Sequence, residues 1–364
     1  MMHCGIYVHI PFCKSKCKYC AFVSTPDFSI RQRYVSALVG EINDCEANGT
    51  VCDTVYIGGG TPSCLPRGAL TRIFTALQKK FVILPESEIT VECNPESVDG
   101  GFVSECKACG VNRVSMGLQS ADDRVLAAIG RVHDVSGYIA AAELLRKNFD
   151  NISSDIILGL PDQNGDDVFR AIETTSRFCS HISVYALSVE EGTPLAKSGF
   201  VADDDGIADM YDAACSALRD RGFDRYEVSN FAKNNMYSRH NIKYWRGVPY
   251  IGFGVAAHGY DGKYTRYAHG NDISAYMQNS APTPYTLTEK DRYNEYVMLA
   301  LRTERGIDLQ DFRNKFGYSF SEANAAIVEQ NVKENYVELS NGFLRISPRY
   351  MFVMNGITEQ FMKD

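Results

Sequence analysis

The sequence has no apolar run near the roughly 20 residues that a membrane-spanning helix needs. It also has no excess of basic residues, since 37 Lys and Arg stand against 45 Asp and Glu for a net charge of −8. That balance argues against a nucleic-acid partner, because phosphate binding normally uses a basic surface. Residues 1–8 lack the basic segment and apolar stretch of a signal peptide. We therefore expect a cytoplasmic protein without a membrane span, and peripheral membrane contact stays open.

The twelve cysteines are unevenly distributed along the 364 residues. Three of them fall within residues 13–20, and the other nine are scattered. A secreted disulfide scaffold would be a short chain with cysteines spread evenly along it, and this chain has neither feature. Most of the scattered cysteines are therefore expected to be small buried side chains of a protein in a reducing compartment.

Short β-rich runs alternate with longer helical patterns through the first two thirds of the chain. This alternation predicts a parallel sheet with right-handed crossovers, as an incomplete barrel or an open doubly wound sheet. The expected helices include residues 30–48, 68–80, 138–147 and 166–178. The expected strands are residues 5–9, 54–58, 89–93, 112–116, 152–158 and 182–187. Polar and Gly-rich segments follow several of these strands, where parallel α/β folds carry their ligand sites.

The remainder of the chain has a different pattern. Residues 226–260 are aromatic, Gly-rich and strand-like, without alternating helices. Helices are expected at 289–302, 308–316, 321–331 and 348–362, with a hairpin at 337–346 that turns at Gly342. This order predicts a small winged-helix-like module. We therefore expect three parts: a core at 1–230, an extension at 231–283 and a C-terminal domain at 284–364.

Cys13, Cys17 and Cys20 have the spacing C-x₃-C-x₂-C directly after an expected strand. Thiolates are the ligands that iron–sulfur clusters require, and a short loop with this spacing can wrap one metal centre. Three ligands on a four-iron cluster leave one iron open to a small molecule. Zinc is the main alternative, although a structural zinc site takes four protein ligands.

The segment Tyr7–Cys20, read as YVHIPFCKSKCKYC, resembles the signature of the radical S-adenosylmethionine (SAM) superfamily. The resemblance continues through Gly58–Ser63, Glu92–Glu96, Asn112–Ser120 and Asp155–Pro161 and into the C-terminal module. It implies a partial (β/α)₆ TIM-like barrel followed by a HemN_C-type winged-helix-like domain. It also implies a [4Fe–4S] cluster on the three cysteines, with SAM on the open iron.

The resemblance also assigns the SAM pocket, residue by residue where the motifs match. Glycine permits close backbone approach to the ligand, and Arg131 suits the methionine carboxylate. The ordinary alternatives are a strand-ending turn for the glycines, helix caps for the two carboxylates and a surface position for Arg131. The implied SAM residues are Tyr7, Tyr19, Gly59, Gly60, Thr61, Glu92, Gln119, Arg131, Asp155 and Ala186.

Within the superfamily, the chain is most similar to oxygen-independent coproporphyrinogen III dehydrogenases and to the HemW heme chaperones. The dehydrogenases carry a further cysteine where this chain has Phe22, and a long extension before the cluster where this chain has twelve residues. The sequence His240-Asn-Ile-Lys-Tyr244-Trp245 resembles the H-N-x-x-Y-W motif of HemW. It implies heme contact by these three side chains, since imidazole ligates heme iron and aromatic rings pack on porphyrin. A hydrogen-bonded core histidine is the alternative, and His258 is a weaker second candidate.

The resulting hypothesis is a heme chaperone that binds heme as cargo and transfers it to an acceptor hemoprotein. The alternatives are a coproporphyrinogen III dehydrogenase and, less favoured by the acidic composition, an RNA-modifying radical SAM enzyme. The acceptor, the electron donor, catalytic cleavage of SAM and the choice between monomer and dimer all stay open.

Overall fold

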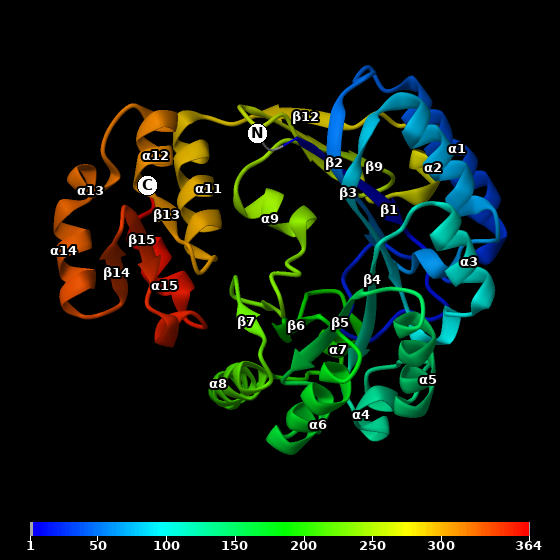
Figure 1. Ribbon diagram of the computed structural model, residues 1–364, viewed down its shortest axis with the longest axis horizontal. Helices are drawn as coiled ribbons and strands as arrows, with labels where there is room; N and C mark the ends of the chain where they lie inside the picture. Colours follow the sequence, from blue (N-terminus) through cyan, green and yellow to red (C-terminus); the bar gives the residue numbers. More distant parts are fainter. Residues whose placement is uncertain (1–2, 364) are drawn as a thin grey trace.

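A computed structural model of the protein describes residues 3–363 and is built around one long mixed sheet (Figure 1). Its centre is six parallel strands that neighbour one another in sequence order. They are β1 (Cys4–Ile10), β2 (Val51–Gly59), β3 (Val82–Cys93), β4 (Arg113–Gln119), β5 (Asn151–Leu158) and β6 (His181–Ala186). All six predicted strands are confirmed; the third begins seven residues earlier than expected, and the other ends differ by at most three residues.

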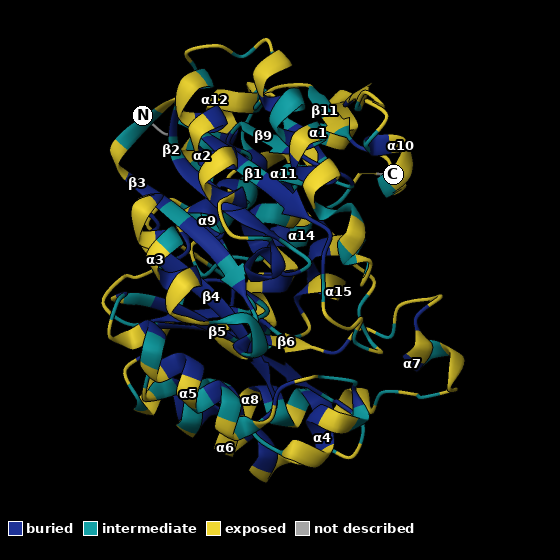
Figure 2. Ribbon diagram, turned by 90° about the vertical axis from the view of Figure 1, so that its right-hand side faces the viewer, coloured by how far each residue is buried: buried dark blue, intermediate teal, exposed yellow. Residues whose placement is uncertain are grey.

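Helices connect successive strands and cover the outer face of the sheet (Figure 2). Their apolar residues recur at helical spacing, so each helix buries one stripe against the strands. In α2, for example, Leu70, Ile73, Phe74 and Leu77 are buried while the opposite face is exposed. The helices are α1 (Arg31–Asp44), α2 (Ala69–Lys80), α3 (Gly100–Ala108), α4 (Asp123–Ala128), α5 (Val135–Arg146), α6 (Gly165–Ser176), α7 (Pro194–Lys197) and α8 (Asp204–Asp220).

The six strands form an open barrel, because β1 and β6 each pair with a later strand instead of with each other. On the free edge of β1 lies β9 (Tyr250–Phe253), which runs parallel to it. β10 (His258–Tyr260), β11 (Thr265–Ala268) and β12 (Thr283–Thr286) follow as antiparallel strands, and α10 (Ile273–Tyr276) lies between the last two in sequence. On the free edge of β6 lie β8 (Asn230–Ala232) and β7 (Asp224–Arg225).

Residues 226–260 differ from the sequence prediction. The segment was expected to be strand-like throughout, but it contains a helix, α9 (Arg239–Trp245). The side chain of Ser238 accepts a hydrogen bond from the Asn241 backbone and so caps the first turn. The first-turn amides of Arg239 and His240 also bond to the Glu88 carboxylate on β3. A cap and a distant carboxylate therefore stabilise a seven-residue helix whose sequence alone is rich in β-forming aromatics.

The C-terminal part builds a separate hydrophobic core from residues 293–361. The predicted hairpin is confirmed as β14 (Val337–Ser340) and β15 (Phe343–Ile346), which turn at Asn341 and Gly342 with positive φ and pair with β13 (Ile307–Asp308). The helices are α11 (Glu289–Leu301), α12 (Leu309–Phe316), α13 (Phe320–Ala323), α14 (Ala325–Lys333) and α15 (Met354–Glu359). The helix expected at 321–331 is thus split at Asn324, and the last one is shorter than expected.

Candidate cofactor site

The loop that carries the three cysteines leaves β1 at Ile10 and is held by the loop that follows β2. The amide of Gly60 donates to the Ile10 carbonyl at 2.8 Å, and the amide of Thr61 donates to the Phe12 carbonyl at 2.7 Å. The Cys13 amide donates to Thr25 on the far side of the loop at 3.2 Å. A Cβ at position 60 would come within 2.8–2.9 Å of the Ile10 and Phe12 backbone, so this close approach requires glycine.

The three thiols are half-buried and close enough to affect one another. Burial raises the pKa of the Cys13 and Cys20 thiols, and neighbouring thiolate charge raises both further. Within residues 3–363, no group of three His, Cys, Asp or Glu side chains converges closely enough to hold a single metal ion. A four-iron cluster instead takes its thiolates at separate corners. Because a structural zinc site takes four protein ligands, the three cysteines fit a cluster better than the zinc alternative.

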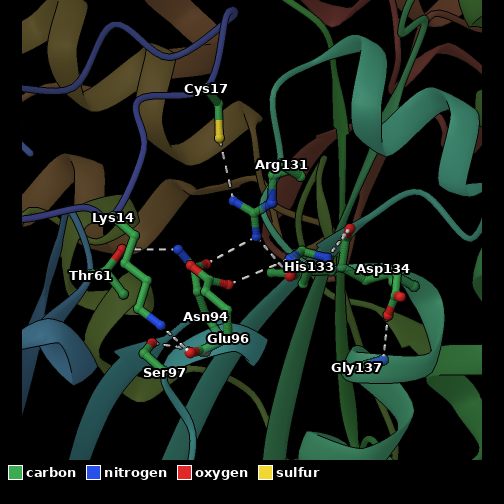
Figure 3. Close-up of polar contacts among 12 residues, drawn as sticks. Lys14, Cys17, Thr61, Asn94, Glu96, Ser97, Arg131, His133, Asp134 and Gly137 are labelled. Carbon is green, nitrogen blue, oxygen red and sulfur yellow. Dashed lines mark hydrogen bonds and ion pairs between the residues drawn. The ribbon is translucent and has the colours of Figure 1, made fainter.

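A chain of polar side chains joins Cys13 to Cys17. Figure 3 shows its part from Thr61 to Cys17. The Thr61 hydroxyl donates to the Cys13 sulfur at 3.4 Å and accepts from the Asn94 amide at 2.9 Å. The Asn94 oxygen accepts from Nη2 of Arg131 at 3.0 Å, and Nη1 of Arg131 lies 3.6 Å from the Cys17 sulfur. Donors that point at thiolate sulfur stabilise its negative charge, so this network suits a thiolate-ligated centre.

Arg131 is held rigidly within this network. Its Nη2 also donates to the Gly117 carbonyl on β4 at 2.9 Å. Although burial opposes the charged form, the nearby Tyr19 and Cys17 groups raise the pKa of Arg131, so the guanidinium stays cationic. Its Nε is buried without a hydrogen-bond partner, which leaves one donor for an anionic group.

A second layer of contacts supports the segment after β3 (Figure 3). His133 is buried, with Nδ1 3.7 Å from the Glu96 carboxylate and Nε2 3.3 Å from the Leu118 carbonyl. Lys14, on the cysteine loop, donates to the Glu96 backbone carbonyl. The Asn94 turn is further tied by Ser97, whose hydroxyl donates to the Asn94 carbonyl at 2.9 Å. These contacts hold the segment that contains Asn94 in place.

Glu92 lies under the glycine loop at the end of β3. Its carboxylate accepts from the Tyr56 hydroxyl at 2.5 Å and from the Gly59 amide at 3.0 Å. A Cβ at Gly58 would lie within 2.8 Å of that carboxylate, and one at Gly59, where φ is +106°, would strike the His9 ring. Burial raises the pKa of Glu92 to about 7 despite the Tyr56 hydrogen bond. The group therefore sits at the midpoint of its titration near neutral pH.

Among the other residues of the predicted SAM pocket, Gln119 and Ala186 end their strands, whereas Asp155 and Tyr7 lie within theirs. Gln119 ends β4 with φ of +70°, and its buried Oε1 has no hydrogen-bond partner. Burial raises the pKa of Asp155 on β5, beside Ser183. Tyr7 lies in the middle of β1, where it stacks on Tyr56. The remaining two are Tyr19, beside Cys17 and Cys20, and Ala186, exposed at the end of β6.

The three residues of the predicted heme motif lie on α9 and face different neighbours. His240 is fully buried: its Nδ1 lies 2.8 Å from the Thr54 hydroxyl and its Nε2 2.8 Å from the Tyr244 hydroxyl. Burial lowers the pKa of His240 to about 3, so the ring is neutral. Trp245 instead faces a cavity against the C-terminal domain. Within this structure the motif therefore does not form one surface.

Comparison with known proteins agrees with this geometry. Residues 7–175 match the Radical SAM superfamily, and residues 287–353 match the HemN C-terminal domain. The heme chaperone HemW of Mycobacterium tuberculosis H37Rv is 35% identical over 84% of this chain and 83% of its own length. The heme chaperone HemW of Bacillus subtilis 168 is 31% identical over 98% of this chain and 99% of its own.

The chain belongs to the HemW family of radical SAM proteins. Family membership implies a [4Fe–4S] cluster and SAM, which the three cysteines and the surrounding polar network fit. Among solved structures, coproporphyrinogen III oxidase (HemN) of Escherichia coli superposes with a TM-score of 0.86 over 99% of this chain and 90% of its own, at 20% identity. That likeness confirms the predicted radical SAM fold.

Sequence reasoning did not single out two residues of this HemW-family site. Asn94 follows the third strand and lies in the segment 92–96, which carries the family resemblance. Its position between Thr61 and Arg131 arises only because the ends of three strands meet. His133 follows Arg131 by two positions, and only its burial beside Glu96 shows that it supports the site.

Among residues 3–363, the structure contains no helix with the length and hydrophobicity to span a membrane.

Proposed function

We propose that this chain is a cluster- and SAM-binding heme chaperone, which receives heme and transfers it to an acceptor hemoprotein. The similarity to curated HemW proteins over almost the whole chain is the observation that carries the proposal. The network from Cys13 to Cys17 supports it, because it preserves a site suited to a three-cysteine cluster. The proposed compartment is the cytoplasm.

In this proposal, the cysteine loop holds the cluster and the surrounding strand ends hold SAM. Gly59, Gly60 and Thr61 would offer backbone groups to SAM beside the cysteine loop, and Glu92 would take the SAM amino group. Arg131 has a free Nε for the SAM carboxylate. When bound, the cluster and SAM supply the one-electron chemistry of the superfamily. The remaining proposed contacts come from Tyr7, Tyr19, Gln119, Asp155 and Ala186.

The proposed heme contacts are His240, Tyr244 and Trp245. Because both ring nitrogens of His240 are engaged, ligation of iron requires release of one hydrogen bond. Tyr244 lies four residues after His240 on α9, so rotation of the Tyr244 side chain would free Nε2. The neutral state of the ring suits this role, since iron binds the unprotonated nitrogen.

Phe22 argues against the coproporphyrinogen dehydrogenase alternative. It occupies the position where that family has a further cysteine, and its side chain is 67% exposed two residues after Cys20. It has no group that could ligate a metal or exchange protons. If the protein were found to oxidise coproporphyrinogen III, that result would therefore overturn the proposal.

Two assays on one anaerobically reconstituted sample test the proposal. Added heme should produce a saturable Soret band, and that heme should pass to an apo-hemoprotein such as apomyoglobin. The same sample, with SAM and a reductant, should leave coproporphyrinogen III unchanged. Conversion to protoporphyrinogen IX would overturn the chaperone assignment, and so would the absence of any saturable heme binding.

A further inference from the structure

Two cysteines outside the cysteine loop, Cys4 and Cys52, lie side by side at the start of the first two strands. Cys4 begins β1, Cys52 is the second residue of β2, and the parallel register of these strands pairs the two residues directly. The cysteine loop leaves the other end of β1, which lies roughly 20 Å away at about 3.3 Å per strand residue. The two thiols therefore form a pair that is separate from the proposed cluster ligands.

The geometry of the Cys4–Cys52 pair suits a disulfide. Neighbouring strands lie about 4.8 Å apart, and register partners in a parallel pair project from the same face of the sheet. A disulfide needs two Cα atoms about 4.4–6.8 Å apart and side chains that point toward each other. The two thiols meet this need, because they are joined by a hydrogen bond. A covalent bond between the two sulfur atoms therefore requires no rearrangement of the sheet.

Charged groups around the pair make the two thiols unequal. Lys243 of α9 is buried, where its Nζ forms an ion pair with Asp53 and donates to the His3 carbonyl at 2.7 Å. The hydrogen bond from Cys52, and then the charge of Lys243, lower the pKa of Cys4, although burial and Asp53 oppose this effect. The same hydrogen bond, together with burial, raises the pKa of Cys52. Cys4 is therefore the thiolate of the pair, and Cys52 holds the proton.

The two thiols also differ in their access to solvent. Cys4 is half-buried, whereas Cys52 is completely buried. Cysteines that respond to oxidants are accessible thiols with a lowered pKa and a second cysteine beside them. Cys4 has the properties of the attacking thiol in such a pair, and Cys52 has those of the second, resolving thiol.

We propose that Cys4 and Cys52 form a reversible disulfide when the protein meets a small-molecule disulfide. The Cys4 thiolate attacks one sulfur of this oxidant, forms a mixed disulfide and releases one thiolate. Cys52 gives its proton to the released thiolate, and its sulfur then displaces the second thiolate from Cys4. The two protein cysteines are oxidised to a disulfide, and the oxidant is reduced to one thiol and one thiolate.

The disulfide closes a ring that contains the cysteine loop. Residues 4–52 include this loop and α1, so both lie between the two linked strands. A cross-link restricts the unfolded chain over the ring that it closes. Under oxidising conditions, the Cys4–Cys52 bond therefore stabilises the segment that carries the proposed cluster ligands. None of the proposed heme contacts takes part, so this inference is independent of heme binding.

Peptide mapping of the reconstituted holoprotein tests the disulfide directly. The protein is incubated without oxygen with oxidised glutathione, its remaining thiols are alkylated, and the digest is analysed by mass spectrometry. A linked peptide that contains Cys4 and Cys52 should appear, lighter by two hydrogen atoms than the two reduced peptides together. Dithiothreitol should remove it, and the iron content should stay unchanged throughout. The oxidised protein should also melt several degrees higher than the reduced protein.

Three variants separate the roles of the two thiols. Cys52→Ser should hold one glutathione on Cys4, because no second thiol remains to displace it. Cys4→Ser should leave Cys52 unmodified, because this thiol is buried. Cys45→Ser, at a half-buried cysteine that follows α1, is the matched control and should form the same linked peptide as the unaltered protein. The iron content of each variant shows whether its cysteine loop is folded.

The mapping of the unaltered protein decides the inference even where a variant fails to fold. Absence of the linked peptide, its appearance only in denaturant, or equally fast glutathione attachment at Cys45 and Cys4 would overturn it. Each of these results would leave the chaperone proposal standing. Conversely, failure of heme binding would overturn the chaperone proposal and leave the Cys4–Cys52 disulfide in place.

Discussion

Nη1 of Arg131 lies 3.6 Å from the Cys17 sulfur, while Nη2 of the same guanidinium bonds to Asn94 and to the Gly117 carbonyl. One side chain therefore links the cysteine loop to the ends of β3 and β4. Asn94 continues the link to Thr61 and Cys13, so one hydrogen-bond network connects the cluster ligands with the strand ends.

Replacement of Cys17 by alanine should abolish the cluster and leave the fold intact, because the thiol is half-buried and outside the hydrophobic core. The unaltered protein, reconstituted without oxygen, should hold about four irons per chain, and the variant almost none. Iron analysis and absorbance near the thiolate-to-iron bands measure this difference. Cys45→Ala, a half-buried cysteine of another loop, should keep its iron. Zinc without iron in the unaltered protein would contradict the cluster assignment.

Replacement of Arg131 by alanine should lower the free energy of unfolding by about 2–4 kcal/mol, because Asn94 and Gly117 lose their buried donor. SAM affinity should fall as well, since the proposed carboxylate partner is gone. Denaturant unfolding and isothermal titration measure the two effects.

Arg124→Ala is the matched control for Arg131, because its guanidinium pairs with Asp122 at the surface. Such an exposed pair is screened by solvent and contributes little to stability. Equal destabilisation by the two substitutions would show that Arg131 is not the link described here.

SAM binding should strengthen as the pH rises through the pKa of Glu92, about 7. The ionised carboxylate attracts the SAM ammonium group, whereas the protonated form does not. Burial raises this pKa, Asp155 raises it further, and Tyr56, Gly59 and Arg113 lower it. Affinity should therefore rise by up to about tenfold per pH unit below pH 7 and level off above it.

Glu92→Gln should remove that pH dependence between about pH 6 and 8, while Glu86→Gln, an exposed glutamate of the same strand, should retain it. Isothermal titration across this range measures both. A pH profile that is the same in all three proteins would exclude Glu92 as the SAM partner.

Acid should destabilise the protein through His240. Its pKa is about 3 in the folded state, against an ordinary value near 6.5, so the folded state holds the ring neutral. Its contribution to stability is complete above pH 6.5 and is lost as the pH falls toward 3, by roughly 5 kcal/mol in total. The groups that face or surround the ring are Thr54, Tyr7, Tyr56, Tyr244, Lys243 and Arg113.

His240→Gln keeps a hydrogen-bonding side chain but cannot titrate, so its melting temperature should fall less steeply than that of the unaltered protein between pH 7 and 4. His258→Gln, at an exposed histidine whose pKa is also lowered by partial burial and by Arg266, is the comparison and should change the profile less than His240→Gln does. Parallel acid profiles for His240→Gln and the unaltered protein would show that the ring titrates normally.

The local pattern of the sequence was enough to predict the six parallel strands and the cysteine loop. Strand periodicity and the spacing of Cys13, Cys17 and Cys20 are properties of neighbouring residues, and backbone geometry converts them directly into structure. The assignment of glycines, Glu92 and Arg131 to one pocket came from family resemblance, because those residues are far apart in the chain. The hairpin at Gly342 was predictable for the local reason as well.

Only the tertiary structure decided the character of α9, the bridging position of Asn94 and the cavity beside Trp245. The helix depends on the carboxylate of Glu88, some 150 residues earlier in the chain, and local propensity carries no information about such a partner. His240 and Trp245, five residues apart, face the sheet and the C-terminal domain respectively because helical geometry turns them to different sides. The sequence determined which residues the protein has for its cofactors, and long-range packing determined which of them meet.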